Sequence, residues 1–314
     1  MFPLLNIFAG LALLALGAEG LVRGSTSVAL RMGVTPLVIG LTIVAFGTGT
    51  PELLVSVEAA RTGNSGIALG NIVGSNIGNI GLILGCAALA RPLRVRSELL
   101  QREVPLMIAI TLAFCLMLWD GELGRIDGAL LLIGSVIYVV GMYALARRDK
   151  NREVAAEFAE VMPPIARSRW VDAAYILAGF AGLVLGANLL VSGATVVAQA
   201  FGLSQVVIGL TVVAVGTSMP ELATSVVAAI RDEADVAFGN VIGSNILNIL
   251  FVIGLVALIH PFSVEALTPL DLVVFAGSAV LLLPLMWRGA ILNRWEGALL
   301  LGGYVAYLAV LLVR

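Results

Sequence analysis

Two short stretches of the chain combine residue types that suit cation binding. GTGTPE occupies residues 47–52 and GTSMPE occupies residues 216–221, and both lie inside long apolar runs. A proline has no N–H group and its ring clashes with the carbonyl four residues earlier, so the carbonyls of Gly47 and Gly216 lose their helical partners. Glycine eases the local unwinding. We therefore predict that each helix stops one residue before its stretch, near 46 and 215, and restarts at its proline.

Each stretch also carries a threonine and a glutamate. Thr48 and Thr217 would lie in the breaks, and Glu52 and Glu221 in the first turn of the restarted helices, where a helix N-terminus favours negative charge. A charged residue inside a membrane costs roughly 2.5–3.5 kcal/mol or more. A cation between two carboxylates offsets that cost, and a hard cation such as Ca²⁺ takes about six to eight oxygen ligands. The two stretches therefore predict a shared site for such an ion.

A second motif follows each stretch. It reads GNIVGSNIGN at 70–79 and GNVIGSNILN at 239–248. A serine and an asparagine four residues apart share one face of a helix. They are Ser75 with Asn79 in the first copy and Ser244 with Asn248 in the second. Small residues at this spacing also let helices pack closely, which is the alternative interpretation. The duplication of the motif beside a duplicated Pro-Glu pair favours ion binding.

The composition places these motifs in a membrane protein. The 314 residues are 60% hydrophobic and 12% charged, whereas a soluble domain carries about 25% charged residues. Apolar segments of about 20 residues, the length that spans a bilayer, recur along the chain. We predict an all-α polytopic membrane protein with ten transmembrane helices. They fall near 3–24, 35–60, 67–90, 103–119, 126–146, 172–198, 204–230, 236–259, 268–287 and 294–313.

An internal repeat relates the two halves of the chain. With an offset of 169, residues 35–85 align with 204–254 without gaps, and 26 of the 51 positions are identical. Five spans per copy is an odd number, so the second copy must lie upside down relative to the first. Inverted repeats with broken helices at the ion sites are typical of secondary transporters. We expect a first repeat over 1–146, a linker over 147–170 and a second repeat over 171–314.

The basic residues predict the orientation in the membrane. If the 147–170 linker is cytoplasmic, 14 of the 18 Lys and Arg residues lie on its side and three on the other. This bias follows the positive-inside rule, so both termini should face outward from the cell inner (plasma) membrane. Asp172 and Asp271 fall at span ends, where we expect solvated charges. Glu19 either lines an access path or forms an intrahelical or interfacial hydrogen bond.

The repeated G-T-x-x-P-E and G-N-x-x-G-S-N-I-x-N motifs resemble the α-repeats of the cation/Ca²⁺ exchanger superfamily, in particular the prokaryotic Na⁺/Ca²⁺ exchangers (sodium/calcium antiporters). The resemblance implies an antiporter that exchanges Na⁺ for Ca²⁺ by alternating access. Glu52 and Glu221 would be the central carboxylates, and the first and sixth helices would slide across a rigid core. The other ion ligands that it implies are Thr48, Thr217, Ser218, Ser75, Ser244, Asn79, Asn248 and the carbonyls of Ala45 and Ala214. Ca²⁺ and Na⁺ are the expected substrates of a monomer in the lipid bilayer, without cofactor or nucleic acid.

Two residues depart from the family pattern. Gly49 stands where the motif usually has Ser, as Ser218 does in the second copy, which removes one hydroxyl from an implied Na⁺ site. Asn248 stands where many relatives have Asp, so the core carries two carboxylates and not three. Two carboxylates still match one Ca²⁺. The coupling ion stays open, with an H⁺/Ca²⁺ or K⁺-dependent cation antiporter of the same superfamily as the alternative.

Two other functional classes fit the sequence less well. An intramembrane enzyme would need a nucleophile with its base, a GxGD-type Asp pair or an HExxH zinc motif, and the sequence contains none of these and a single His. A passive Ca²⁺ channel would place its carboxylates in a ring of subunits, with no need for inverted, duplicated breaks. We therefore expect a transporter and not an enzyme.

Overall fold

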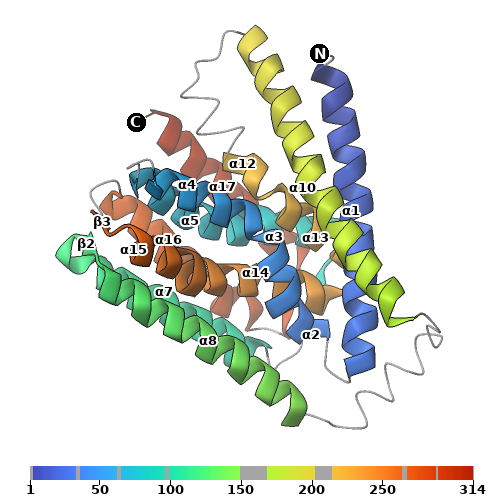
Figure 1. Ribbon diagram of the computed structural model, residues 1–314, viewed down its shortest axis with the longest axis horizontal. Coiled ribbons are helices and arrows are strands. Elements are labelled where there is room, and N and C mark those ends of the chain that lie inside the picture. Colours follow the sequence, from blue (N-terminus) through green and yellow to red (C-terminus); the bar gives the residue numbers. More distant parts are fainter. Residues whose placement is uncertain are drawn as a thin grey trace.

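The computed structural model is almost entirely helical (Figure 1). It describes residues 3–32, 36–61, 65–95, 99–148, 168–201, 214–263, 267–287 and 289–313. Most of the predicted linker and the start of the seventh predicted span, residues 204–213, lie outside these ranges. Within them, every predicted span falls on helix. In the described ranges seven helices are long and apolar enough to cross a membrane, or eight if one bent pair counts as a single span.

The first half of the chain forms five helical segments, several of which contain a π-helical or 3₁₀ section. They are α1 (Pro3–Met32); α2 (Pro36–Ile39), η1 (Gly40–Val44), α3 (Ala45–Thr48) and α4 (Thr50–Arg61); α5 (Ser65–Gly78), η2 (Asn79–Leu84) and α6 (Gly85–Ala90); η3 (Leu99–Glu103), α7 (Val104–Met117) and η4 (Leu118–Asp120); and α8 (Arg125–Arg148).

The second half repeats this order as far as it is described. Its elements are α10 (Arg169–Ala200); α12 (Ala214–Thr217) and α13 (Met219–Ile230); α14 (Ala234–Leu247), η6 (Asn248–Ile253) and α15 (Gly254–Ile259); α16 (Pro269–Met286); and α17 (Arg294–Val313). Short strands join some of the helices: β1 (Leu93–Arg94), β2 (Glu122–Leu123), β3 (Phe262–Ser263) and β4 (Ile291–Leu292).

The strand pairs fit an inverted arrangement of the two halves. β1, after the third segment, pairs with β4, before the last segment, and β2 pairs with β3. If each predicted segment crosses the membrane once, β1 and β4 lie on one side and β2 and β3 on the other. Paired strands must share a side, so the pairing agrees with ten crossings. A copy in the same orientation as the first would place these loops on opposite sides.

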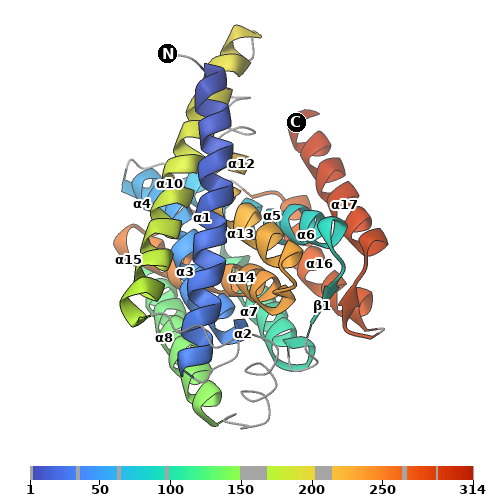
Figure 2. The same ribbon diagram turned by 90° about the vertical axis from the view of Figure 1, so that its right-hand side faces the viewer.

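Helices α1 and α10 form a crossed pair beside the rest of the bundle (Figures 1 and 2). Glycines allow the two backbones to touch: a Cβ added at Gly17 would lie 2.7 Å from the Gly179 carbonyl oxygen, and one at Gly179 would lie 2.6 Å from the Leu21 nitrogen. Leu14, Leu21 and Leu183 of the pair belong to a small hydrophobic cluster that also includes Ile39 of α2 and Val44 of η1. The two helices therefore form a closely packed pair, and Arg231 at the end of α13 joins this pair to the core through an ion pair with Glu19 of α1.

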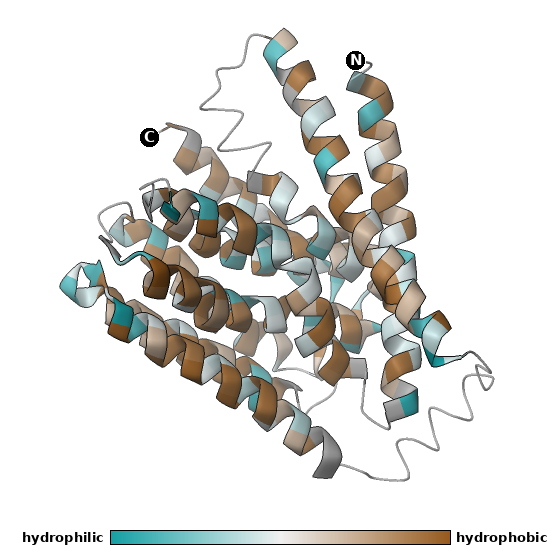
Figure 3. Cartoon of the chain, viewed as in Figure 1, coloured by the Kyte–Doolittle hydropathy of each residue, from teal (hydrophilic) through white to brown (hydrophobic). Residues whose placement is uncertain are grey.

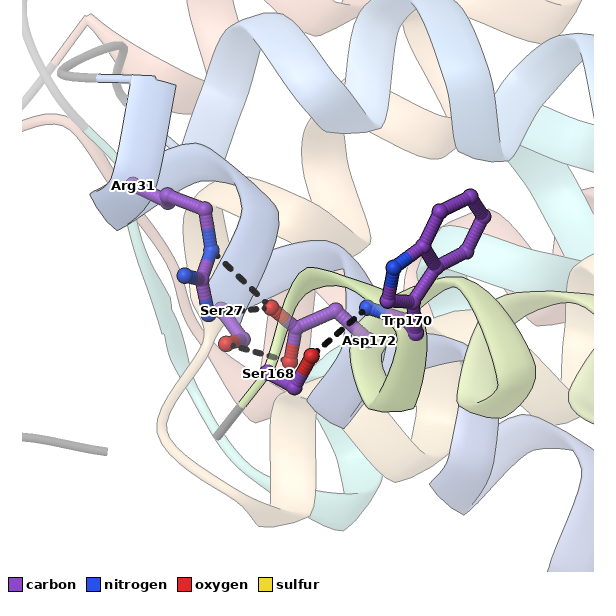
Figure 4. Close-up of polar contacts among 5 residues, drawn as sticks. All are labelled: Ser27, Arg31, Ser168, Trp170 and Asp172. Atoms are coloured by element: carbon purple, nitrogen blue, oxygen red, sulfur yellow. Dashed lines mark hydrogen bonds and ion pairs between the residues drawn. The ribbon is translucent and has the colours of Figure 1, made fainter. Parts of the chain in front are cut away.

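Asp172 fastens the two helices of this unit together (Figure 4). Its side chain is 1% exposed, accepts a hydrogen bond from Ser27 (2.8 Å) and pairs with Arg31 (2.7 Å), and both partners lie on α1. The expectation of a solvated charge is therefore wrong for Asp172. It is wrong for Asp271 as well, which is buried, closes a capping box with Thr268 and accepts a bond from Tyr307. Both carboxylates lie in the first turn of a helix, where the helix dipole and their hydrogen-bond partners offset the cost of burying a charge.

The core is made by the helices that carry the second motif. Residues of α5 and α14, among them Ile72, Ile77, Ile242 and Ile246, are buried, whereas α8 presents large hydrophobic side chains outward. Figure 3 shows many hydrophobic residues, coloured brown, along α8. Exposed tryptophans mark the helix ends, as expected of an aromatic belt at a membrane interface. They are Trp119, Trp170, Trp287 and Trp295.

Candidate ion-binding site

The breaks predicted from the two prolines are present but narrower than expected. Helix α3 continues through Thr48 and α4 begins at Thr50, so only Gly49 interrupts them; Ser218 does the same between α12 and α13. Both residues adopt nearly the same conformation, with φ of −76° and −89° and ψ near 0°. The predicted stop near 46 and 215 is therefore wrong by about two residues.

The reason lies in the hydrogen bonds around the break. The Gly49 N–H still reaches the Ala45 carbonyl at 3.0 Å, and the Gly49 carbonyl accepts the Leu53 N–H at 3.1 Å. Because Pro51 lies in the first turn of the new helix, where a missing N–H is tolerated, the chain needs only to bend. The bend is 44°. This geometry leaves Glu52 in the first turn of α4, and Glu221 in that of α13, as predicted.

The two carboxylates face the opposite break. Ser218, the residue between α12 and α13, donates a hydrogen bond to Glu52 Oε1 at 3.1 Å. Conversely, a Cβ added at Gly49 would lie 3.9 Å from Glu221 Oε1 and 3.8 Å from Asn248 Oδ1. The site is therefore built by both halves together, with a hydroxyl at one of two equivalent positions and a glycine at the other.

In the part of the chain that the structure describes, the buried oxygens without a hydrogen-bond partner include four atoms of the predicted ligands. They are Glu52 Oε2, Glu221 Oε2, Asn79 Oδ1 and Ser244 Oγ. Among the described residues no basic side chain forms an ion pair with either glutamate. Unpaired carboxylates inside a membrane are costly, and a bound cation removes both the charge and the unmet hydrogen-bonding demand. A hard cation accepts this donor set, because all four atoms are oxygens.

Four asparagines cross-link the helical segment of α5 and η2 with that of α14 and η6. Asn79 Nδ2 donates to Asn245 Oδ1, and Asn248 Nδ2 donates to Asn76 Oδ1, both at 2.9 Å. Asn76 Nδ2 in turn donates to the Asn245 carbonyl at 3.1 Å. Because the amide nitrogens of Asn79 and Asn248 are engaged, their oxygens are turned away from these partners. A π-helical section starts at each of these two residues, and such sections occur often at functional sites.

The remaining predicted ligands lie on the same elements. Ala45, Thr48, Ser75 and Ser218 are buried, and Thr217 is half-buried at the end of α12. Ala214 begins α12, but its side chain lies outside the described part. The carbonyl of Ala45 accepts the Gly49 N–H and keeps a second lone pair.

Sequence reasoning missed the residues that hold these ligands in place. Asn76 and Asn245 are 169 residues apart, which is the repeat offset, and each lies three residues before a predicted ligand. This duplication could have identified them. Asn240 accepts a hydrogen bond from Thr48 at 3.1 Å across the two halves. No spacing within one repeat predicts that contact, because it depends on how the halves intersect.

Comparison with known proteins agrees with this geometry. The family model described as sodium/calcium exchanger protein matches twice, at residues 2–144 and 171–313. The chain is 40% identical over 306 residues to the putative antiporter CaxA of Alkalimonas amylolytica, covering 96% of both chains. It is 32% identical to the sodium/calcium exchanger MaX1 of Methanosarcina acetivorans, over 98% of this chain and 97% of that protein.

A solved structure of the sodium–calcium exchanger NCX_Mj matches the fold, with a TM-score of 0.86, 32% identity and 99% coverage of both chains. The fold is thus that of a multi-pass membrane transporter with inverted repeats. The chain belongs to the sodium/calcium exchanger family, which confirms the resemblance seen in the motifs.

Proposed function

We propose that this chain is a secondary active antiporter that exchanges Na⁺ for Ca²⁺ across a membrane, binding both ions between Glu52 and Glu221. The observation that carries the proposal is the reciprocal placement of the two glutamates against the opposite breaks, with unpartnered oxygens around them. Two carboxylates balance one Ca²⁺. The neutral oxygens of Ser218, Ser244 and Asn79 suit Na⁺ as well.

If Na⁺ and Ca²⁺ bind at one shared site, this site must open to each side of the membrane in turn. We infer that α1 and α10 are the elements that move, because most of their buried residues belong to a smaller hydrophobic cluster, while α5 and α14 stay packed in the main core. The asparagine cross-links between α5 and α14 support that division. We infer that the pair shifts as one body, because Asp172 holds its two helices together.

The division of the chain into repeats and its orientation in the membrane are part of the proposed function. We propose a first repeat over 1–146, a cytoplasmic linker over 147–170 and a second repeat over 171–314, with both termini outside and one chain as the transporting unit. The Lys and Arg distribution supports this orientation in a plasma membrane.

Competition between the two ions tests the shared site. Ca²⁺ is titrated calorimetrically into the purified protein in detergent, in KCl and in NaCl of equal ionic strength. Saturable Ca²⁺ binding that weakens with Na⁺ but not with K⁺ is the expected result, because Na⁺ would occupy the same oxygens. Ca²⁺ binding that Na⁺ leaves unchanged, or no Ca²⁺ binding, would contradict the proposal. Weakening by acid alone would favour H⁺ as the coupling ion.

A further inference from the structure

Asn240 occupies a fully buried position on α14 from which it contacts both halves of the chain. Its Nδ2 donates to Ser225 Oγ at 3.0 Å and to the Glu221 carbonyl at 3.4 Å, both on α13. Its Oδ1 accepts the Thr48 hydroxyl at 3.1 Å. The side chain therefore connects the helix that carries Glu221 with the break of the opposite repeat.

The neighbours fix which end of the amide points where. Ser225 donates its own hydrogen to the Ala237 carbonyl at 3.4 Å, so its oxygen is left to accept. The Glu221 carbonyl can only accept. The NH₂ group of Asn240 must therefore face α13, and its oxygen must face Thr48, where a donor is required.

This orientation has a consequence for the Thr48 hydroxyl. A hydroxyl binds a cation through its oxygen lone pairs, so its hydrogen must point elsewhere. Two acceptors away from the carboxylates are available to that hydrogen, the Asn240 oxygen and the Val44 carbonyl, each at 3.1 Å. Without Asn240 the hydrogen would be freer to turn toward Glu221 and compete with the ion.

We propose that Asn240 is a positioning residue that orients the Thr48 hydroxyl so that its lone pairs, and not its hydrogen, face the bound cation. The inference rests on the proposed function, since Thr48 must be an ion ligand for it to hold. The equivalent Asn71 makes the same two contacts within the first half, to Ser56 at 3.0 Å and the Glu52 carbonyl at 3.4 Å. Asn71 therefore provides a matched comparison on the opposite repeat.

A double-mutant cycle measured by Ca²⁺ titration of the purified protein tests the inference. Asn240→Ala should raise the half-saturating Ca²⁺ concentration about three- to tenfold, the range expected for one lost hydrogen bond. Thr48→Val removes the hydroxyl at constant shape. Because Asn240 acts through that hydroxyl, the double variant should bind no worse than Thr48→Val alone.

Asn71→Ala is the control for coupling: combined with Thr48→Val, its effect should add. An additive effect of Asn240→Ala and Thr48→Val, or unchanged Ca²⁺ binding in Asn240→Ala, would overturn the inference. If Asn240→Ala does not fold, Ser225→Ala can replace it, because this change removes one hydrogen-bond partner of the Asn240 amide. Ser225→Ala should weaken Ca²⁺ binding less than Asn240→Ala, and it should have no effect in the Thr48→Val background. Should the unaltered chain fail to bind Ca²⁺, the proposed function fails instead.

Discussion

At the scale of single residues, the proposed ion exchange depends on the charges of Glu52 and Glu221. Both are at most 2% exposed, and each keeps one oxygen without a partner. A unit charge about 4 Å from a cation is worth about 4 kcal/mol at an effective dielectric constant of about 20. Replacing either glutamate by glutamine keeps the shape and removes this term.

Glu52→Gln and Glu221→Gln should therefore each lower Ca²⁺ transport below detection in a vesicle uptake assay. Glu58→Gln is the matched control, because Glu58 lies on the same helix α4 with an exposed side chain and should leave transport intact. Normal uptake by either of the first two variants would show that the carboxylates are not the ion ligands.

Gly49 is the position where the two halves of the site differ. A serine at this position would bring its hydroxyl next to Glu221, as Ser218 lies next to Glu52, although its Cβ would press on the Ala45 carbonyl at 3.1 Å. We expect Gly49→Ser to lower the half-saturating Na⁺ concentration by roughly the effect of one hydrogen bond, a few-fold, and to change Ca²⁺ affinity less.

The reverse change serves as the comparison. Ser218→Gly removes the remaining hydroxyl and should raise the half-saturating Na⁺ concentration in the same uptake assay. A Na⁺ dependence that neither substitution alters would mean that this pair of positions does not bind Na⁺.

Residue types and their duplication were enough to select candidate ligands, but not to predict how these side chains are held. Glu52, Glu221 and the Ser and Asn pairs stand out because apolar segments rarely contain them. The contacts Thr48–Asn240 and Asn79–Asn245 join positions about 170 or more residues apart, and they exist only because the two copies interlock. Local spacing carries no information about them.

At the scale of helices, the prolines predicted breaks of several residues, whereas a single residue, Gly49 or Ser218, interrupts each helix. A proline in the first turn of a helix lacks a partner that is missing there in any case. Burial of the helix ends was also underestimated: Asp172 lies in the first turn of α10, yet it is buried and bonds to Arg31 and Ser27 of α1. Sequence alone does not show that these two helices cross at that point.

Asp172→Asn should loosen the α1–α10 pair, because it removes the charge that Arg31 and Ser27 satisfy. A charge-assisted, buried bond is worth about 2 kcal/mol, so the thermal unfolding temperature in detergent should fall by several degrees. Asp232→Asn is the control, since Asp232 pairs with Arg91 on the exposed surface and should change little. Equal unfolding temperatures for Asp172→Asn and the unaltered chain would show that this pair adds no stability.

At the scale of the whole molecule, the odd number of spans in each repeat was the most informative feature of the sequence. It required the two halves to be inverted, and the pairing of β1 with β4 and β2 with β3 agrees with that topology. The packing of α1 against α10 was not predictable from composition, because all of these helices are similarly apolar. The two backbones touch at Gly17 and Gly179, and this contact is visible only in the structure.

The proposed exchange requires that a Na⁺ gradient drives Ca²⁺ through this molecule. The most direct test is ⁴⁵Ca²⁺ uptake into proteoliposomes loaded with Na⁺, compared with K⁺-loaded and acid-inside vesicles. The account predicts uptake only with an outward Na⁺ gradient, despite Gly49 and Asn248. Uptake driven only by the pH gradient, or equally in all three preparations, would contradict Na⁺/Ca²⁺ exchange.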